Sequence, residues 1–299
     1  MKKNRKLLPL FLLLALGAPA TRADCLGMAL HAHRGSYDAP ENSSRAVLRA
    51  FEGRWDGAEI DIQRLGDQEW ILHHDPVLGR TTTLQKRRSA SIDSATWNEI
   101  RLRDRKGGVS TERAPFLADV LDAVEADDNK VLNVEIKEFN SNCRAAQDAA
   151  RLLGERRPNG QWFLTSIDRA QLQCVRQVDR RGYVGQILLD AKSLLRHSGF
   201  GQAGRRVVQK SPDAAWLERL KQDVGAPVGV HVDALMLAAD PALLERARTA
   251  GVAIFTFSLS GDREHVQALR NAAARTRLLP SGAVIDGAAE QFCQALGSL

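Results

Sequence analysis

The sequence predicts a protein of the α/β class, namely a closed (β/α)₈ TIM barrel with a small insertion after the second strand unit. Short apolar runs typical of buried strands alternate with amphipathic segments typical of helices along most of the 299 residues. The chain holds about eight such strand–helix units, the number that closes a barrel. An open, doubly wound sheet is the alternative, but no glycine-rich phosphate loop follows the first predicted strand.

Each predicted element is a run of residues with the matching periodicity. The predicted strands are Met28–His33, Ala58–Ile62, Lys130–Lys137, Trp162–Ser166, Tyr183–Leu189, Val228–Val232, Val252–Ser258 and Ala283–Asp286. The predicted helices between them include Ser43–Glu52, Pro115–Glu125, Cys143–Glu155, Arg169–Arg180, Ala214–Val224, Pro241–Ala250 and Arg263–Asn271. In a barrel built from such units, the carboxyl ends of the strands all meet at one face.

The first 23 residues have the features of a secretory signal peptide. A basic start precedes the apolar run Leu7–Leu16, and small residues that offer cleavage sites follow it. The run is shorter than the roughly 20 apolar residues that span a bilayer, although a retained N-terminal anchor is the alternative. We therefore predict a signal peptide at 1–23, a barrel domain at 24–299, and a secreted or periplasmic protein without stable membrane insertion once the signal is removed.

Removal of this segment also changes the charge of the protein. The full sequence has 42 basic and 36 acidic residues, which give a net charge of +6. The predicted signal peptide holds five of the basic residues, so 37 remain and the net charge falls to +1. A chain without a basic excess is not expected to bind nucleic acid.

Four cysteines remain after the predicted cleavage, and none has the close paired spacing of a zinc site. An even count in an exported protein favours disulfides, with free buried thiols as the alternative. Cys143 and Cys174 lie in neighbouring outer helices of the predicted barrel, so we expect them to pair. Cys25 and Cys293 would then join the start of the barrel to its last helix.

Acidic side chains gather at the carboxyl ends of two predicted strands. Residues two apart in a strand point to the same face, so Glu59 accompanies Asp61, and Glu135 accompanies Lys137. Three carboxylates among apolar neighbours are too costly to desolvate unless a cation accompanies them. Each acid alone is more typical of a surface or a salt bridge, but together they indicate a hard divalent cation bound by oxygen ligands.

Two histidines are the candidates for proton transfer. His33, followed by Arg34, ends the first predicted strand. In the later run EWILHH, strand alternation places His74 on the face opposite His73, so only His74 should reach the cleft. A lone histidine is usually structural, but two imidazoles near a cation can act as base and acid in one displacement.

These motifs, taken in order, resemble the signature of the glycerophosphodiester phosphodiesterase family. The matching residues are His33-Arg34-Gly35, Pro40-Glu41-Asn42, Glu59-x-Asp61, His74-Asp75 with Arg80-Thr81-Thr82, and Glu135-Ile136-Lys137. The segment 76–112 is similar to the small insertion subdomain of that family. Ile254-Phe255-Thr256-Phe257 and Val284-Ile285-Asp286-Gly287 depart from the family pattern, and both departures concern the wall that selects the alcohol.

The resemblance implies a role for each matching residue. Glu59, Asp61 and Glu135 would bind a divalent cation, Ca²⁺ or Mg²⁺. His33 and His74 would form the general acid/base pair, and Arg34 and Lys137 would contact the phosphate. The segment Pro40-Glu41-Asn42 would shape the loop that holds His33 and Arg34 in place.

The implied reaction is metal-dependent hydrolysis of a small-molecule glycerophosphodiester to sn-glycerol 3-phosphate and an alcohol. The attacking oxygen would be water or the neighbouring glycerol hydroxyl, which gives a cyclic phosphate, and either histidine could be the acid. Two alternatives stand beside this interpretation: a phospholipase D-like enzyme acting on sphingomyelin or lysophospholipid head groups, and a secreted binding protein on the same barrel. The first requires an exposed apolar rim and the second a missing catalytic residue or ligand, and the sequence indicates neither.

Overall fold

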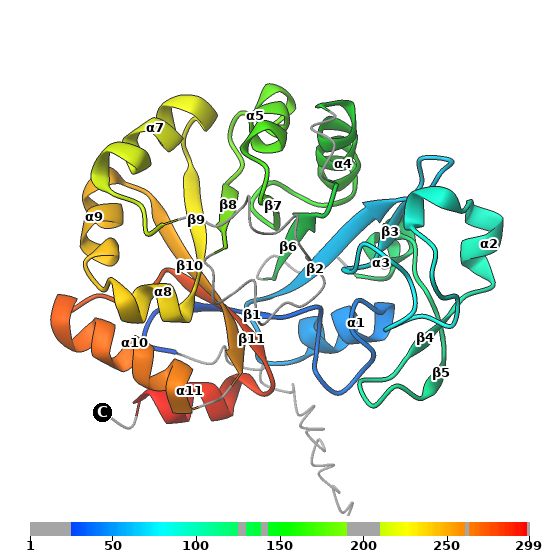
Figure 1. Cartoon of the computed structure of the whole chain (residues 1–299), viewed down its shortest axis with the longest axis horizontal. Helices are drawn as coiled ribbons and strands as arrows, with labels where there is room; N and C mark the ends of the chain where they lie inside the picture. Colours follow the sequence, from blue (N-terminus) through cyan, green and yellow to red (C-terminus); the bar gives the residue numbers. More distant parts are fainter. Residues whose placement is uncertain (1–24, 125–129, 139–142, 190–209, 261–262, 298–299) are drawn as a thin grey trace, which may run out of the picture.

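The computed structural model describes residues 25–124, 130–138, 143–189, 210–260 and 263–297. At its centre, eight parallel strands form a ring (Figure 1). They are β1 (Ala29–Ala32), β2 (Gly57–Arg64), β6 (Val131–Ile136), β7 (Trp162–Ser166), β8 (Val184–Leu188), β9 (Val228–Asp233), β10 (Ala253–Ser260) and β11 (Gly282–Asp286). The predicted signal peptide, residues 1–23, lies outside the described residues.

The ring strands follow one another in chain order, and β1 pairs with both β2 and β11. The sheet therefore closes on itself, which confirms the predicted (β/α)₈ barrel and excludes the open sheet. Barrel strands are buried on both faces, as in β9, whose six residues are all buried. Strands of this kind have continuous apolar runs rather than alternating ones, which is why the sequence pattern predicted all eight.

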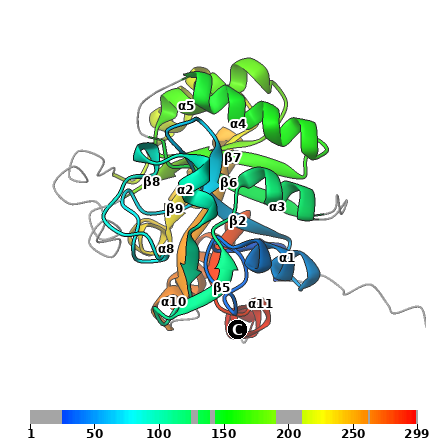
Figure 2. The same cartoon turned by 90° about the vertical axis from the view of Figure 1, so that its right-hand side faces the viewer.

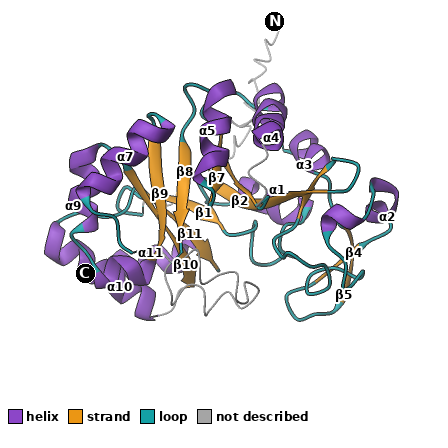
Figure 3. Ribbon diagram, turned by 45° about the horizontal axis from the view of Figure 1, so that its top comes forward, coloured by secondary structure: helices purple, strands orange, loops and turns teal. Residues whose placement is uncertain are grey.

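Helices cover the outside of the ring (Figure 3). They are α1 (Ser44–Glu52), α3 (Leu117–Ala123), α4 (Cys143–Arg156), α5 (Arg169–Val178), α7 (Ala214–Val224), α8 (Ala234–Ala239), α9 (Leu243–Ala250), α10 (Arg263–Thr276) and α11 (Ala289–Gly297). Side chains cap several of them: Asp168 accepts the Ala170 N–H at the start of α5, and Asp213 accepts the Trp216 N–H at the start of α7. None of the described helices combines the length and apolar character needed to cross a membrane.

The chain leaves the barrel between β2 and α3. β2 runs on beyond the ring and pairs antiparallel with β3 (Trp70–Leu72), which lies outside the ring. The 3₁₀ turn η1 (Ser89–Ser91), α2 (Ser94–Asn98) and the hairpin of β4 (Arg101–Arg103) and β5 (Val109–Arg113) follow. These elements, which face the viewer in Figure 2, include the segment 76–112 and have a small apolar core of their own around the fully buried Trp97.

Both predicted disulfides are present. Cys143 at the start of α4 is bonded to Cys174 in α5, and Cys25 before β1 is bonded to Cys293 in α11. The Cα atoms are 5.1 Å apart in each bridge. All four cysteines are thus paired, which excludes the alternative of free buried thiols.

The bridge between Cys25 and Cys293 should contribute most to stability. Its residues are 268 positions apart, against 31 for the other bridge. In the loop-entropy account these separations correspond to about 6 and about 4 kcal/mol. We expect the double variant Cys25→Ser/Cys293→Ser to lower the urea midpoint more than Cys143→Ser/Cys174→Ser. Unchanged midpoints in both double variants, or free thiols in mass mapping of the non-reduced protein, would contradict the pairing.

Candidate active site

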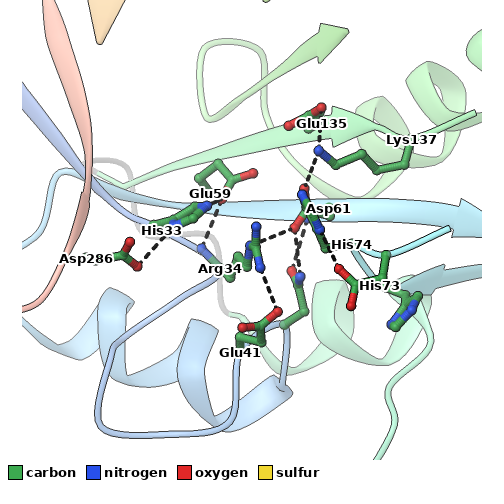
Figure 4. Close-up of polar contacts among 12 residues, drawn as sticks. His33, Arg34, Glu41, Glu59, Asp61, His73, His74, Glu135, Lys137 and Asp286 are labelled. Carbon is green, nitrogen blue, oxygen red and sulfur yellow. Dashed lines mark hydrogen bonds and ion pairs between the residues drawn. The ribbon is translucent and has the colours of Figure 1, made fainter. Parts of the chain in front are cut away.

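One pocket opens at the carboxyl ends of the barrel strands. It is lined by all seven residues that the sequence predicts for the site: His33, Arg34, Glu59, Asp61, His74, Glu135 and Lys137. The rest of the lining consists of Asn133, Thr165, Ile167, Ile187, Leu189, His231, Phe257 and Val284. Figure 4 shows the polar side of the pocket, where side chains from β1, β2 and β6 converge.

The three carboxylates converge because β2 and β6 are neighbours in the ring. Asp61 lies directly beside Glu135 across the two strands, and Glu59 precedes Asp61 by two residues on the same face. One oxygen of each residue lies within 4.8 Å of the other two. The prediction that Glu59 and Asp61 end their strand is wrong, because β2 continues to Arg64 through its pairing with β3. The three residues, hereafter the acidic triad, are all buried or nearly so.

Two cationic side chains lie against the acidic triad. Lys137 Nζ is 2.6 Å from Glu135 Oε1 and 3.2 Å from Asp61 Oδ1. Arg34 Nε is 3.3 Å from Asp61 Oδ2, while Arg34 Nη1 is 2.7 Å from Glu41 Oε1. Because Arg34 is shared with Glu41, the two cations do not neutralise the triad.

Glu59 is the triad carboxylate that lacks a basic partner among the described lysines and arginines. It accepts the backbone N–H of Arg34 at 2.9 Å, and His33 Nε2 lies 4.0 Å from its Oε2. Burial, followed by repulsion from Asp61, raises the pKa of Glu59 to about 8. Burial acts in the same direction on Asp61, but Lys137 holds the pKa of Asp61 well below its usual range. A cation beside Glu59 would restore the charged form of this side chain, as a metal site requires.

Asn42 orients Asp61 from the loop that follows β1. Its Nδ2 donates to Asp61 Oδ2 at 2.8 Å, and its Oδ1 accepts the backbone N–H of Asp61 at 3.0 Å. Arg34 and Asn42 both have left-handed φ values, 55° and 54°, which are uncommon outside glycine and cluster at functional sites. The sequence predicts only a loop-shaping role for Pro40-Glu41-Asn42, since strand alternation does not reveal the conformation of a loop.

His33 is held by a residue of the last strand. Its Nδ1 lies 2.9 Å from Asp286 Oδ1. Ala32 of β1 is paired with Ile285 of β11 in the closed ring. The residues that follow them, His33 and Asp286, therefore lie next to each other at the end of the barrel. Burial lowers the pKa of His33, but the charge of Asp286 helps to raise it above its usual value overall. The sequence assigns Asp286 only to the wall that selects the alcohol. Its contact with His33 could have been inferred from the closure of the barrel, which places the end of β11 beside the end of β1.

His74 reaches the pocket from the segment after β3, and its Nδ1 lies 2.8 Å from Asp75 Oδ1. Burial, followed by repulsion from Lys137, lowers the pKa of His74 to about 3. His73 does not line the pocket; it is 2% exposed, and its ring centre is 6.3 Å from that of Trp97. The two histidines therefore lie on opposite sides, as strand alternation predicts (Figure 4).

Arg80 connects the two sides of the site. Its Nη2 and Nη1 lie 2.6 and 2.9 Å from the two carboxylate oxygens of Glu41, and its Nε lies 2.7 Å from Asp75 Oδ2. Glu41 in turn pairs with Arg34, and Asp75 pairs with His74. A continuous series of ion pairs, completed by the hydrogen bond between Asp75 and His74, therefore fixes Arg34 relative to His74. The sequence motifs contain all of these residues, but Arg80 receives no role from them.

The opposite wall of the pocket is apolar. It includes Phe257 and Val284, which belong to the two stretches that depart from the family pattern, so both stretches reach the pocket. His231 also lines it, and its ring stacks on Phe255 with centres 4.8 Å apart. His231 Nε2 lies 3.2 Å from the hydroxyl of Tyr183, and burial lowers the pKa of His231 to about 3. His231 is thus a neutral aromatic part of the wall.

Fold and site together define a class of protein: a (β/α)₈ barrel whose carboxyl face holds an acidic triad suited to a metal ion, with two histidines in the same pocket. The family model described as "Glycerophosphoryl diester phosphodiesterase family" matches residues 33–275. The chain therefore belongs to this family, as its motifs predict.

Curated relatives resemble part of the chain. A Caldanaerobacter subterraneus protein named glycerophosphodiester phosphodiesterase is 35% identical over 113 residues, which are 36% of this chain and 44% of that protein. The uncharacterized protein YqiK of Bacillus subtilis is 32% identical over 114 residues, again 36% of this chain and 44% of that protein. The matched segment thus spans less than half the length of either relative.

Solved structures resemble the chain over nearly its whole length. A glycerophosphodiester phosphodiesterase from Parabacteroides distasonis has a TM-score of 0.68 at 16% identity, covering 91% of this chain and 98% of that one. A phosphodiesterase from Oleispira antarctica, solved in complex with the product sn-glycerol-3-phosphate, has a TM-score of 0.68 at 20% identity, covering 90% and 96%. At these identities the similarity establishes a shared fold.

Proposed function

We propose that this protein catalyses the metal-dependent hydrolysis of glycerophosphodiesters to sn-glycerol 3-phosphate and an alcohol. The proposal rests on one observation: the same pocket contains the acidic triad, two buried cationic side chains, and two histidines that are each hydrogen-bonded to a carboxylate. The name of the Caldanaerobacter relative and the product bound in the Oleispira structure support the same substrate class.

The acidic triad would hold the metal ion. Ca²⁺ prefers oxygen ligands at about 2.3–2.6 Å, so triad oxygens within 4.8 Å of one another can share one Ca²⁺. Mg²⁺ prefers about 2.0–2.1 Å, so oxygens that share it must lie within about 4.2 Å of one another. Glu59, which has no described lysine or arginine partner, supplies the charge that such a cation would neutralise. When bound, the cation would polarise a phosphoryl oxygen and offset negative charge in the transition state.

Arg34 and Lys137 would bind the anionic oxygens of the diester. Both side chains are buried, and both lie against Asp61, which keeps them at the pocket wall. A phosphodiester that leaves water for this pocket needs charged hydrogen-bond donors to replace its hydration. The planar guanidinium of Arg34 has parallel N–H groups that can donate hydrogen bonds to two phosphate oxygens at once.

His33 and His74 would divide the two proton transfers between them. One would take the proton of the attacking oxygen, which belongs to water or to the glycerol hydroxyl beside the phosphate, and the other would protonate the leaving alkoxide. If the glycerol hydroxyl attacks, a cyclic phosphate forms first and is then hydrolysed. Asp286 and Asp75 hold Nδ1 of the two rings, so Nε2 is the nitrogen available to the substrate in each.

The direct test measures release of choline from glycerophosphocholine, micellar lysophosphatidylcholine and sphingomyelin in parallel, together with release of sn-glycerol 3-phosphate from the first of these substrates. We expect turnover of the water-soluble diester. Cleavage of the two lipids without cleavage of the diester would favour a phospholipase D-like enzyme instead. Binding of the diester without turnover would favour a binding protein.

We also propose that the protein works outside the cytoplasm, as a secreted or periplasmic enzyme. The first 23 residues have the composition of a signal peptide, and the two disulfides suit an oxidising compartment. Cell fractionation with an antibody against the mature chain tests this, and a cytoplasmic pool of uncleaved protein would contradict it.

Glu41→Gln should slow the reaction although Glu41 lies outside the pocket lining. The substitution keeps the shape of the side chain but removes the charge that joins Arg34 to Arg80. Because a hydrogen bond to a charged group contributes about 1.5 kcal/mol or more, we expect kcat/KM to fall about tenfold or more.

Glu112→Gln is the matched control, since Glu112 pairs with Arg45 outside the pocket. Steady-state kinetics of both variants should show a loss for Glu41→Gln alone. Equal losses would mean that Glu41 acts only through general stability.

A further inference from the structure

Arg105 lies at the edge of the site, in the turn of the β4–β5 hairpin. Its guanidinium carbon is 4.2 Å from the centre of the Tyr37 ring. Tyr37 belongs to the loop after β1, three residues beyond Arg34, and is 53% exposed. In Figure 1 the hairpin of β4 and β5 lies beside the loop that follows β1. The segment inserted between β3 and α3 thus brings a positive charge to the loop that carries His33 and Arg34.

The guanidinium of Arg105 has donors without an acceptor. Its Nε and Nη2 are buried and have no hydrogen-bond partner, and Arg105 forms no ion pair in the described part of the chain. Arg103 in the same hairpin, by contrast, donates to the carbonyl oxygens of Thr82 and Gly107 at 3.1 and 3.0 Å. Buried donors without acceptors are costly and uncommon. Stacking on Tyr37 orients the side chain without using its N–H groups. Because protein atoms cover Nε and Nη2, a ligand reaches these two donors only when the side chain turns, and pairing them would remove the cost of leaving them unsatisfied.

The charge of Arg105 acts on the His33 side of the pocket. Burial raises the pKa of Asp286, but His33 and then Arg105 lower it overall. Asp286 is the carboxylate that holds His33 Nδ1. Arg105 is therefore close enough for its field to reach Asp286, although the two do not form an ion pair.

We propose that Arg105, steadied by Tyr37, determines substrate preference by binding a second phosphate group carried by the alcohol part of the substrate. This inference rests on the proposed hydrolysis. The scissile phosphate would bind the metal ion held by the triad, together with Arg34 and Lys137, while a further phosphate on the alcohol would meet the guanidinium of Arg105 once that side chain turns toward it. A guanidinium binds a phosphate through two parallel hydrogen bonds and repels a cationic alcohol such as choline.

The test compares two substrates in one assay of sn-glycerol 3-phosphate release. Bis(glycerophospho)glycerol carries a second phosphodiester on the alcohol, and glycerophosphocholine carries a cation in its place. Arg105→Ala should lower kcat/KM for the first substrate about tenfold, mainly through KM, because one charged hydrogen-bonding group is lost. The value for glycerophosphocholine should stay within about twofold of the parent or rise. Arg105→Lys keeps the positive charge but not the planar guanidinium. Its kcat/KM for bis(glycerophospho)glycerol should therefore lie between the values of the parent and of Arg105→Ala.

Lys106→Ala is the matched control. Lys106 is the next residue of the same turn, carries the same charge and is exposed, so its loss should leave the ratio of the two kcat/KM values unchanged. An unchanged ratio in Arg105→Ala, an equal loss for both substrates, or a loss as large in Lys106→Ala would each overturn the inference. If the parent hydrolyses both substrates, any of these three results refutes only the role of Arg105 and leaves the proposed hydrolysis intact. If the parent hydrolyses neither substrate, the proposed hydrolysis is refuted as well.

Discussion

Glu59→Gln is expected to abolish cation binding at physiological concentrations and turnover with it. The substitution keeps the volume of the side chain but removes the triad charge that has no described lysine or arginine against it. Loss of a group that merely hydrogen-bonds a metal ligand already costs roughly 10–100-fold in affinity, and loss of a ligand charge should cost more. Titration calorimetry with Ca²⁺ and Mg²⁺ measures the change directly.

Asp233→Asn is the control for this variant. Asp233 is also a buried carboxylate at the end of a barrel strand, but it lies outside the pocket lining and caps α8 by accepting the Leu235 N–H at 2.8 Å. Asparagine caps helices as well as aspartate does, so the fold should tolerate the change. Cation affinity should be preserved in Asp233→Asn. An affinity preserved equally in Glu59→Gln would show that Glu59 is not a ligand.

Cation binding should also release a proton. Burial and the neighbouring Asp61 raise the pKa of Glu59 to about 8, so this carboxyl is protonated near neutral pH when no cation is bound. Binding at about pH 7 should therefore release about one proton, and affinity should rise with pH until Glu59 is ionised in the free protein. Calorimetry in buffers of different ionisation enthalpy counts the protons. Heats that do not depend on the buffer would contradict this account of Glu59.

His33→Ala and His74→Ala should each reduce turnover by about 10² to 10⁴. Neither side chain belongs to the acidic triad, so cation affinity and the circular dichroism spectrum should remain close to those of the parent. His73→Ala is the internal control: its ring packs near Trp97 outside the pocket, so turnover should stay within a few-fold of the parent. A loss in His73→Ala as large as in His74→Ala would contradict the placement of the two rings.

A second substrate separates the acid from the base. With a nitrophenyl diester the leaving anion departs without a proton, so the variant that lacks the acid should recover much of its lost rate. The variant that lacks the base should not recover. If neither His33→Ala nor His74→Ala slows cleavage of a glycerophosphodiester, the acid/base mechanism must be abandoned.

The barrel could be predicted from sequence because its strands are short apolar runs with clear polar boundaries. Helix α8 could not, since the stretch from Val228 to Ala239 is mostly apolar throughout and the change from strand to helix occurs at Asp233 without a break in that run. The antiparallel β3 was visible as a run of strand-like residues, but its pairing with β2 and the resulting extension of β2 to Arg64 depend on tertiary contact.

The seven predicted residues of the pocket could be found for a related reason: they lie on strands or shortly after them, where alternation fixes the direction of each side chain. The residues that hold them in place could not. Asn42 reaches Asp61 through a loop with left-handed residues, and Asp286 reaches His33 only because the last strand closes against the first. Arg80 joins Glu41 to Asp75, which are 34 positions apart in the sequence, and no local periodicity encodes this contact.

The measurement that tests the central claim most directly is the release of sn-glycerol 3-phosphate from a panel of glycerophosphodiesters with and without a chelator. The buried acidic triad predicts that release stops in excess EDTA and returns when Ca²⁺ or Mg²⁺ is added back. Full turnover in excess chelator would contradict the assignment of the triad as a metal site and the mechanism built on it.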